Sequence, residues 1–280
     1  ALLKEKIRVR YNLKPLNNGG KRWAEGSLFI LKGENKNIQD FDATLRRIAS
    51  QTNQKISPIA SGFSDLGIDL GSNEMEYIAP KRVGLIKSDN ASPQGYGEVW
   101  HFFEQQLQYP ISQISMNRLN DRTLDQFDVL ILPPGYYSNF ASKDSELLKW
   151  IRKGGRIIAL GSAVRALEGH DSLSLQLKEN SDNTNPQNIP FAEEERNDIS
   201  SAIYGSIYAV DVDTTHPLAF GYDKHYYSLK NSEVSYSFLN GGSVGKLPKN
   251  SKPLAGFSGS KATKLQSESL IFGMENLGRG

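Results

Sequence analysis

Histidine and glutamate occur in this chain at a spacing that zinc sites use. His101 and Glu104 are separated by two residues, and His216 follows much later. A His-x-x-Glu pair and a distant second histidine can hold a zinc ion that activates water. Here, however, the pair lies between Trp100 and Gln105 in an amphipathic stretch, where both side chains are expected to be ordinary helix residues. The chain has no cysteine, and we predict neither a metal site nor a cofactor.

A second segment of chemical interest is Gly154–Ser162, and its last residue is a serine. The segment is typical of a buried strand that ends in a turn of small residues. A serine nucleophile needs a general base within reach, and hydrolases often present it in a Gly-x-Ser-x-Gly turn. Ser162 instead stands in the sequence Leu-Gly-Ser-Ala-Val. We expect it to cap a helix beginning at Ala163. The alternatives are that Ser162 lines a pocket or acts as a nucleophile, with His216 as its candidate base.

The remaining histidines are expected to be structural or exposed. His216 starts a His-Pro-Leu sequence. It would either contact a ligand near the sheet or precede a helical turn in which Pro217 is the first residue and a neighbouring threonine is the cap. We favour the structural role. His170 and His225 lie in polar, tyrosine-rich surroundings and are expected at the surface.

Three glycine-containing loops form the best candidate for a ligand site. Ligands of open parallel sheets bind beyond the carboxyl ends of the strands, and three predicted strands end in Ser92–Glu98, Pro133–Tyr137 and Gly161–Ser162. Glycines allow close backbone approach, free amides at helix N-termini attract anions, and tyrosines can stack. The predicted pocket residues are Gly95, Tyr96, Glu98, Gly135, Tyr136 and Ser162. Tight turns without a ligand are the alternative.

These residues are carried by strands and helices that alternate from residue 82 onward. Apolar runs predict strands at 82–87, 111–114, 128–132 and 156–160. A helix is predicted over 97–107 with Val99, Phe102, Phe103 and Leu107 inward, and another, capped by Ser142, with Leu147, Leu148 and Ile151 inward. Such alternation predicts a doubly wound, mostly parallel α/β sheet, with 82–87, 128–132 and 156–160 parallel and buried. Further β segments are expected around 203–212, 226–229, 235–239 and 270–272.

Residues 1–80 are predicted to form a smaller α/β region that precedes a second region, 81–280. Its predicted strands are 7–13, where Ile7, Val9, Tyr11 and Leu13 alternate with polar residues, then 27–31 and 55–60. Its predicted helix has Asn37 as N-cap and Ile38, Phe41, Leu45 and Ile48 on one face. The segment 61–72 is expected to be a loop, and Ala79-Pro80-Lys81 marks the boundary.

Charge and hydropathy argue against two classes of partner. The 280 residues include 33 basic and 31 acidic side chains, and no basic stripe is dense enough to follow a nucleic-acid backbone. No apolar run approaches the roughly 20 residues that span a bilayer. The chain begins at Ala1, which is not a start methionine, runs directly into the strand predicted from Ile7, and ends in a strand and a glycine-containing turn. We therefore expect it to be a piece of a longer protein.

Four motifs, read in order, resemble one family. They are GYGEVWHFFEQQL (95–107), DVLILPPGYY (128–137), LLKWIRKGGRIIALGSA (147–163) and THPLAFGY (215–222). These motifs resemble the class I glutamine amidotransferase-like domain that lies C-terminal to the catalytic domain in bacterial carboxypeptidase-A-like zinc peptidases. The resemblance covers roughly 82–280. It implies a flavodoxin-like sheet for the second region.

Enzymes of the amidotransferase-like fold place a nucleophilic cysteine just after the strand that corresponds to 156–160. At this position the chain has Gly161 and Ser162. The resemblance thus implies a non-catalytic accessory region of an exported, periplasmic or secreted protein, with a zinc-peptidase domain upstream as its partner. That region would recognise a substrate or partner, or pack on the peptidase domain. The alternatives are a degenerate amidotransferase or hydrolase using Ser162, a zinc enzyme using His101, Glu104 and His216, and a carbohydrate- or peptide-binding module.

Overall fold

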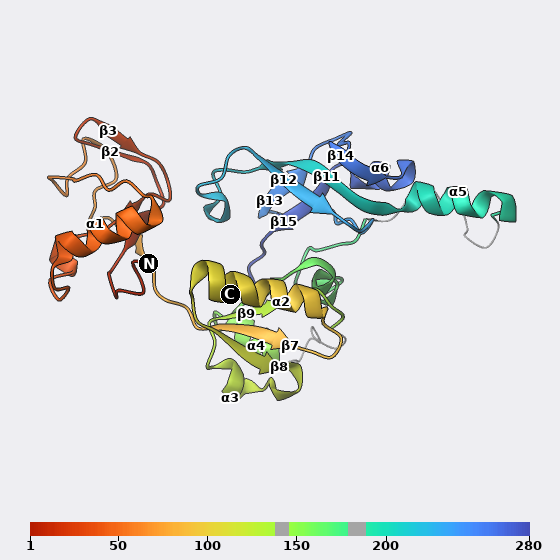
Figure 1. Cartoon of the computed structure of the whole chain (residues 1–280), viewed down its shortest axis with the longest axis horizontal. Coiled ribbons are helices and arrows are strands. Elements are labelled where there is room, and N and C mark those ends of the chain that lie inside the picture. The colour runs from red at the N-terminus through yellow and green to blue at the C-terminus, as the bar shows by residue number, and fades with distance from the viewer. Residues whose placement is uncertain (138–145, 179–188) are drawn as a thin grey trace. The chain divides into compact units, whose positions relative to one another are not determined.

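The computed structural model describes residues 1–137, 146–178 and 189–280. The chain divides into two compact units: unit 1 is Ala1–Pro80 with Thr214–Gly221, and unit 2 is Lys81–Asp213 with Tyr222–Gly280. Figure 1 labels most of their helices and strands. Within the described ranges, no helix is both long enough and apolar enough to cross a membrane.

Unit 1, every residue of which the structure describes, contains two small antiparallel sheets of order β4-β1-β6 and β3-β2-β5. Its elements are β1 (Arg10–Asn12), β2 (Leu16–Asn18), β3 (Lys21–Trp23), β4 (Leu28–Phe29), α1 (Phe41–Thr52), β5 (Leu66–Gly67) and β6 (Met75–Tyr77). One apolar cluster joins Ile7 and Val9 to α1, and another surrounds Leu16 and Phe29. Two small cores therefore hold the unit together.

The predicted strands of unit 1 are shortened or missing. The alternation that starts at Ile7 fails at Asn12, which is fully buried and whose Nδ2 donates to Lys14 O and Ala24 O. Of the predicted strand 7–13, only Arg10–Asn12 (β1) is a strand. Residues 55–60 form no strand, contrary to prediction. Pro58 lies within this segment, and proline cannot donate to a ladder of hydrogen bonds.

Helix α1 has the predicted apolar face but a different beginning. Leu45 and Ile48 are buried, as the sequence predicted. Asp40, not Asn37, occupies the N-cap position, and the helix starts at Phe41. Asp40 is in the left-handed conformation (φ 48°), which cannot belong to a right-handed helical run. This residue separates the helix from the turn that precedes it.

The parallel sheet predicted for unit 2 is confirmed, with strand order β10-β9-β7-β8 and parallel pairing throughout. Its strands are β7 (Val83–Lys87), β8 (Ile111–Ser115), β9 (Val129–Leu132) and β10 (Arg156–Ala159). The neighbouring helices are α2 (Pro93–His101), α3 (Asp121–Leu124) and α4 (Glu146–Arg152). Val83 and Leu85 pack with side chains of α2, whereas Leu130 and Leu132 pack with α3 and α4. Both faces of the sheet are thus covered (Figure 1).

Strand β10 is parallel, as predicted, but it is not buried. It pairs only with β9 among the described strands, and Ile158 is 45% exposed. An edge strand lacks the second neighbour that would cover it.

Helix α4 has the predicted apolar face, since Leu147, Leu148 and Ile151 are buried. The predicted cap of that helix, Ser142, lies outside the described residues.

The helix predicted over 97–107 begins earlier and changes its geometry. Helix α2 starts at Pro93, and the chain from Phe102 to Leu107 is π-helical. The wider π turn rotates the side chains relative to an α-helix. Phe102 and Leu107, predicted to face inward, are consequently 44% and 48% exposed. Phe103 still packs toward the sheet.

The C-terminal part of unit 2 forms an antiparallel sheet instead of extending the parallel one. Its order is β12-β11-β13-β15, and β14 also pairs with β11. Its elements are α5 (Phe191–Ser201), β11 (Ile203–Val212), β12 (His225–Lys230), β13 (Ser243–Leu247), β14 (Ala255–Ser258), α6 (Ser260–Gln266) and β15 (Ser269–Gly273). The predicted strand 235–239 is reduced to isolated bridges at Tyr236. Unit 2 therefore combines a parallel and an antiparallel sheet.

Candidate functional site

The turns after β7, β9 and β10 come together at one end of the parallel sheet. Ser92 N donates to Pro134 O at 2.7 Å, and Ala91 forms an antiparallel bridge with Gly135. A Cβ on Gly161 would lie 3.4 Å from the Pro134 ring, which places the third turn beside the second. The loops selected from the sequence are therefore neighbours in space.

The glycines of these turns are explained by packing of one turn on another. A Cβ built on Gly95 would lie 2.7 Å from Pro134 Cδ, and one on Gly135 would lie 2.7 Å from Ala91 Cα. Both distances are shorter than real Cβ contacts. Gly161 has φ 54°, in the left-handed region that glycine adopts without strain. The close approach that these glycines allow is made by the protein itself.

The tyrosines and the glutamate at this end of the sheet differ in how far they are exposed to solvent. Tyr96 packs in the apolar cluster beneath α2, and burial raises the pKa of its hydroxyl, which has no partner among the described residues. Tyr137 donates to Pro133 O at 2.8 Å, and burial raises its pKa to about 12. Tyr136 is 68% exposed, and Glu98 is an exposed helix residue. Tyr136 is thus the most exposed of these three tyrosines.

Ser162 is exposed and does not cap a helix. A 3-10 helix covers Gly161–Leu167, so Ser162 lies inside it, and Leu160 occupies the N-cap position. The expected cap is thus wrong, because the helical turn begins one residue earlier, at Gly161. Within the described part of the chain, no side chain is hydrogen-bonded to the Ser162 hydroxyl. Nothing in these contacts would activate it as a nucleophile.

The candidate metal ligands are not gathered into a site. His101 and Glu104 are exposed helical residues, and Glu104 accepts a hydrogen bond from Trp100 Nε1 at 2.6 Å. His216 belongs to unit 1, and its Nδ1 accepts from Leu218 N at 3.2 Å. Across residues 1–137, 146–178 and 189–280, no three histidine, aspartate or glutamate side chains are placed to hold a metal ion.

The same hydrogen bond gives His216 its structural role. The histidine itself, and not a neighbouring threonine as predicted, caps the 3-10 helix Pro217–Ala219. His225 is exposed as expected, and its Nδ1 lies 3.1 Å from Asp211 Oδ1. His170 is buried, contrary to prediction, and its Nδ1 accepts a hydrogen bond from Ser172 N at 3.1 Å.

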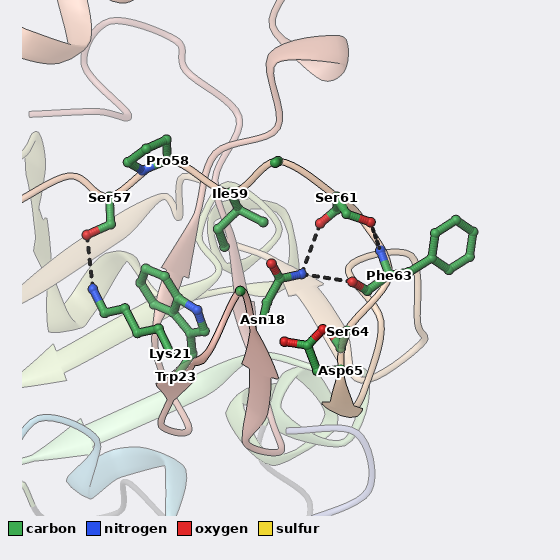
Figure 2. A pocket seen from close by; sticks show the side chains of 12 residues that line it. Asn18, Lys21, Trp23, Ser57, Pro58, Ile59, Ser61, Phe63, Ser64 and Asp65 are labelled. Atoms are coloured by element: carbon green, nitrogen blue, oxygen red, sulfur yellow. Dashed lines mark hydrogen bonds between the residues drawn. The ribbon is translucent and has the colours of Figure 1, made fainter.

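A groove that the sequence did not reveal lies in unit 1 (Figure 2). Its volume is about 550 Å³, within the range of small-ligand sites. It runs between the β2–β3 hairpin and the segment Ser57–Asp65. Asn18 fixes this segment, since its Nδ2 donates to Ser61 O and Phe63 O at 3.0 and 2.9 Å.

The two ends of the groove carry opposite charges. Figure 2 places Lys21 and Ser57 at one end, and Ser64 and Asp65 at the other. Lys21 Nζ donates to Ser57 Oγ at 2.9 Å and lies 4.2 Å from the centroid of the Trp23 ring. The arrangement can bind a small ligand that has an acceptor at one end and a donor at the other.

The hairpin is the signal that would have identified this groove. Asn18 is followed by Gly19 and Gly20, both with positive φ. Consecutive glycines between short apolar and aromatic stretches are typical of a two-residue hairpin turn. Recognising it would have placed Lys21 and Trp23 on one face of β3, because side chains alternate along a strand.

Comparisons with known proteins identify no family. No protein-family model matches the chain, and no curated protein is similar to it. One similar solved structure is a putative ThuA-like protein from Bacteroides uniformis, with 11% identity and a TM-score of 0.34. The similarity covers 56% of this chain and 60% of that one, so the match spans less than two thirds of that protein.

Proposed function

We propose that this chain is a non-catalytic recognition region of a larger, exported protein that resembles bacterial zinc carboxypeptidases. In this proposal the parallel sheet of unit 2 is a scaffold, and ligand recognition takes place in the groove of unit 1. The location, periplasmic or secreted, and the zinc-peptidase partner domain come from the sequence motifs at 95–107, 128–137, 147–163 and 215–222.

The observation that carries the proposal is the turn after β10. Amide hydrolysis needs a nucleophile, a base to activate it and donors aimed at the developing oxyanion. Ser162 is exposed, and no described side chain is hydrogen-bonded to it. The imidazole of His216, its candidate base, is occupied in capping a helix of unit 1. These contacts favour a role in binding over one in catalysis.

The test compares turnover of glutamine and of C-terminal peptide substrates by the wild-type chain, Ser162→Ala and His216→Ala. We expect no turnover above buffer for any of the three. Turnover by the wild-type chain that disappears in Ser162→Ala would refute the proposal and establish the degenerate hydrolase instead. Because Ser162 is exposed, its alanine variant should fold like the wild type, with a stability change within about 0.5 kcal/mol.

A further inference from the structure

The groove of unit 1 contains a cation and a carboxylate that have no ionic partner. Lys21 contacts the neutral Ser57 hydroxyl and the Trp23 ring. Asp65 accepts one long hydrogen bond, 3.4 Å, from Gly20 N. Neither forms an ion pair with the other or with any other described residue. Both charges are therefore available to a ligand that lies between them.

Most of the neutral polar groups of the groove are already engaged. The amide hydrogens of Asn18 are donated to Ser61 O and Phe63 O, and Ser61 Oγ accepts from Phe63 N at 3.1 Å. Ser64 Oγ donates to Ile68 O at 2.6 Å. A sugar is recognised through many hydroxyl contacts, each needing a donor or acceptor. The groove instead offers two charges separated by an apolar surface.

The apolar surface comes from side chains on both walls. Trp23 and Ile59 belong to one apolar cluster, and Pro58 lines the groove beside them. Figure 2 shows Ile59 and Trp23 between the ends marked by Lys21 and Asp65. A ligand that matches this order has an anionic end, an apolar middle and a cationic end.

We propose that the groove binds a short peptide with free termini. The carboxylate of the peptide is bound by Lys21, its ammonium group by Asp65, and an apolar side chain packs against Trp23 and Ile59. The inference rests on the proposed recognition function and specifies its ligand class. Charge-assisted hydrogen bonds at the two ends supply the specificity for both termini.

The experiment is a calorimetric titration of the chain with the tripeptide alanyl-leucyl-alanine in three forms: unmodified, C-amidated and N-acetylated. The variants Lys21→Met and Asp65→Asn remove one charge each and keep the side-chain shape. We expect each variant to bind the unmodified peptide about tenfold more weakly, the effect of losing one hydrogen bond to a charged group. Lys21→Met should leave the weak binding of the amidated peptide unchanged, and Asp65→Asn that of the acetylated peptide.

Lys14→Met and Asp42→Asn are the matched controls, because both residues are exposed and neither lines the groove. They should bind the unmodified peptide like the wild type. Circular dichroism verifies that all variants are folded. The amidated and acetylated peptides remove one charge each from the ligand instead of from the protein, so they test the same two charge pairs with the wild-type chain.

The proposal is overturned if the unmodified peptide shows no saturable binding at millimolar concentration, or if it binds no better than its amidated and acetylated forms. It is also overturned if maltotriose binds in the groove and the peptide does not. These results differ from a failure of the proposed function, which would appear as Ser162-dependent turnover whatever the peptide titration gives.

Discussion

Replacing Gly95 by alanine should destabilise unit 2, whereas the same change at Gly97 should stabilise it. Both glycines lie in α2. A Cβ on Gly95 would lie 2.7 and 2.9 Å from two ring carbons of Pro134, a ring that cannot rotate away. A Cβ on Gly97 would meet no atom within 4 Å. The two substitutions are therefore chemically identical and differ only in this contact.

The magnitude follows from two opposing effects. Alanine in place of glycine stabilises a helix by about 0.5–1 kcal/mol, because it reduces the freedom of the unfolded chain. Forcing an extra methyl group into a packed contact costs about 1–3 kcal/mol. Gly97→Ala receives only the gain, so the free energies of unfolding of the two variants should differ by about 1–3 kcal/mol. For a unit of this size the difference corresponds to roughly 2–12 °C in melting temperature.

The assay is urea unfolding followed by tryptophan fluorescence in a Trp23→Phe background. The chain has three tryptophans, and the other two, Trp100 and Trp150, are both in unit 2. Adding Pro134→Ala should recover most of the loss caused by Gly95→Ala, with a coupling of about 0.5–3 kcal/mol. Equal stability of the two glycine variants, or no recovery, would show that the turns are not packed as described.

Three further predictions concern charge and packing in unit 2. Arg82 holds the pKa of Asp128 at about 2 through hydrogen bonds, so the carboxylate contributes stability that is present above about pH 4 and lost as pH falls toward 2. Asp128→Asn should lower the urea midpoint much more at pH 7 than at pH 2, where about half of the folded chains have lost the charge; equal effects at both values would contradict this. Burial lowers the pKa of Lys230 to about 8, below its unfolded value of about 10.4, so stability should rise between those pH values as the unfolded chain alone keeps the proton. Lys230→Met should abolish that rise, measured by urea midpoints at pH 7.5 to 10; an unchanged rise would assign it to other groups. In Gly155→Ala the new Cβ would lie 2.2 Å from the buried Trp150 ring, so a loss of about 1–3 kcal/mol and an altered near-ultraviolet circular dichroism spectrum are expected, and a wild-type spectrum would refute the contact.

The two central strands of the parallel sheet, β7 and β9, were predictable because they are buried on both faces. The apolar runs of β7 and β9 have no polar alternation, which is typical of interior strands of a parallel sheet. Strand β11 was located by its β-forming residues, but its alternating burial belongs to a sheet with one exposed face. The sequence pattern did not show that the chain would start a second, antiparallel sheet there.

The contacts at the predicted site were harder to predict from the sequence than the strands. Gly95 and Gly135 were predicted to let a ligand approach the backbone closely, but the atoms that approach them belong to Pro134 and Ala91. Sequence identifies a residue that permits contact and cannot name its neighbour. Tyr96 likewise has an amphipathic side chain, and only the orientation of α2 decides that it packs in the core.

By itself, the sequence determined the local order of strands, helices and turns, because that order depends on the spacing of apolar residues and on glycine and proline within a few positions. The tertiary structure alone decided which side chains meet. The groove joins Lys21 to Ser57 and Asn18 to Ser61, pairs that lie 36 and 43 residues apart in the chain. Contacts at such separations depend on how the apolar cluster around Leu16 and Phe29, which includes Trp23 and Ile59, brings the hairpin and the 57–65 segment together, and no short-range pattern encodes that packing.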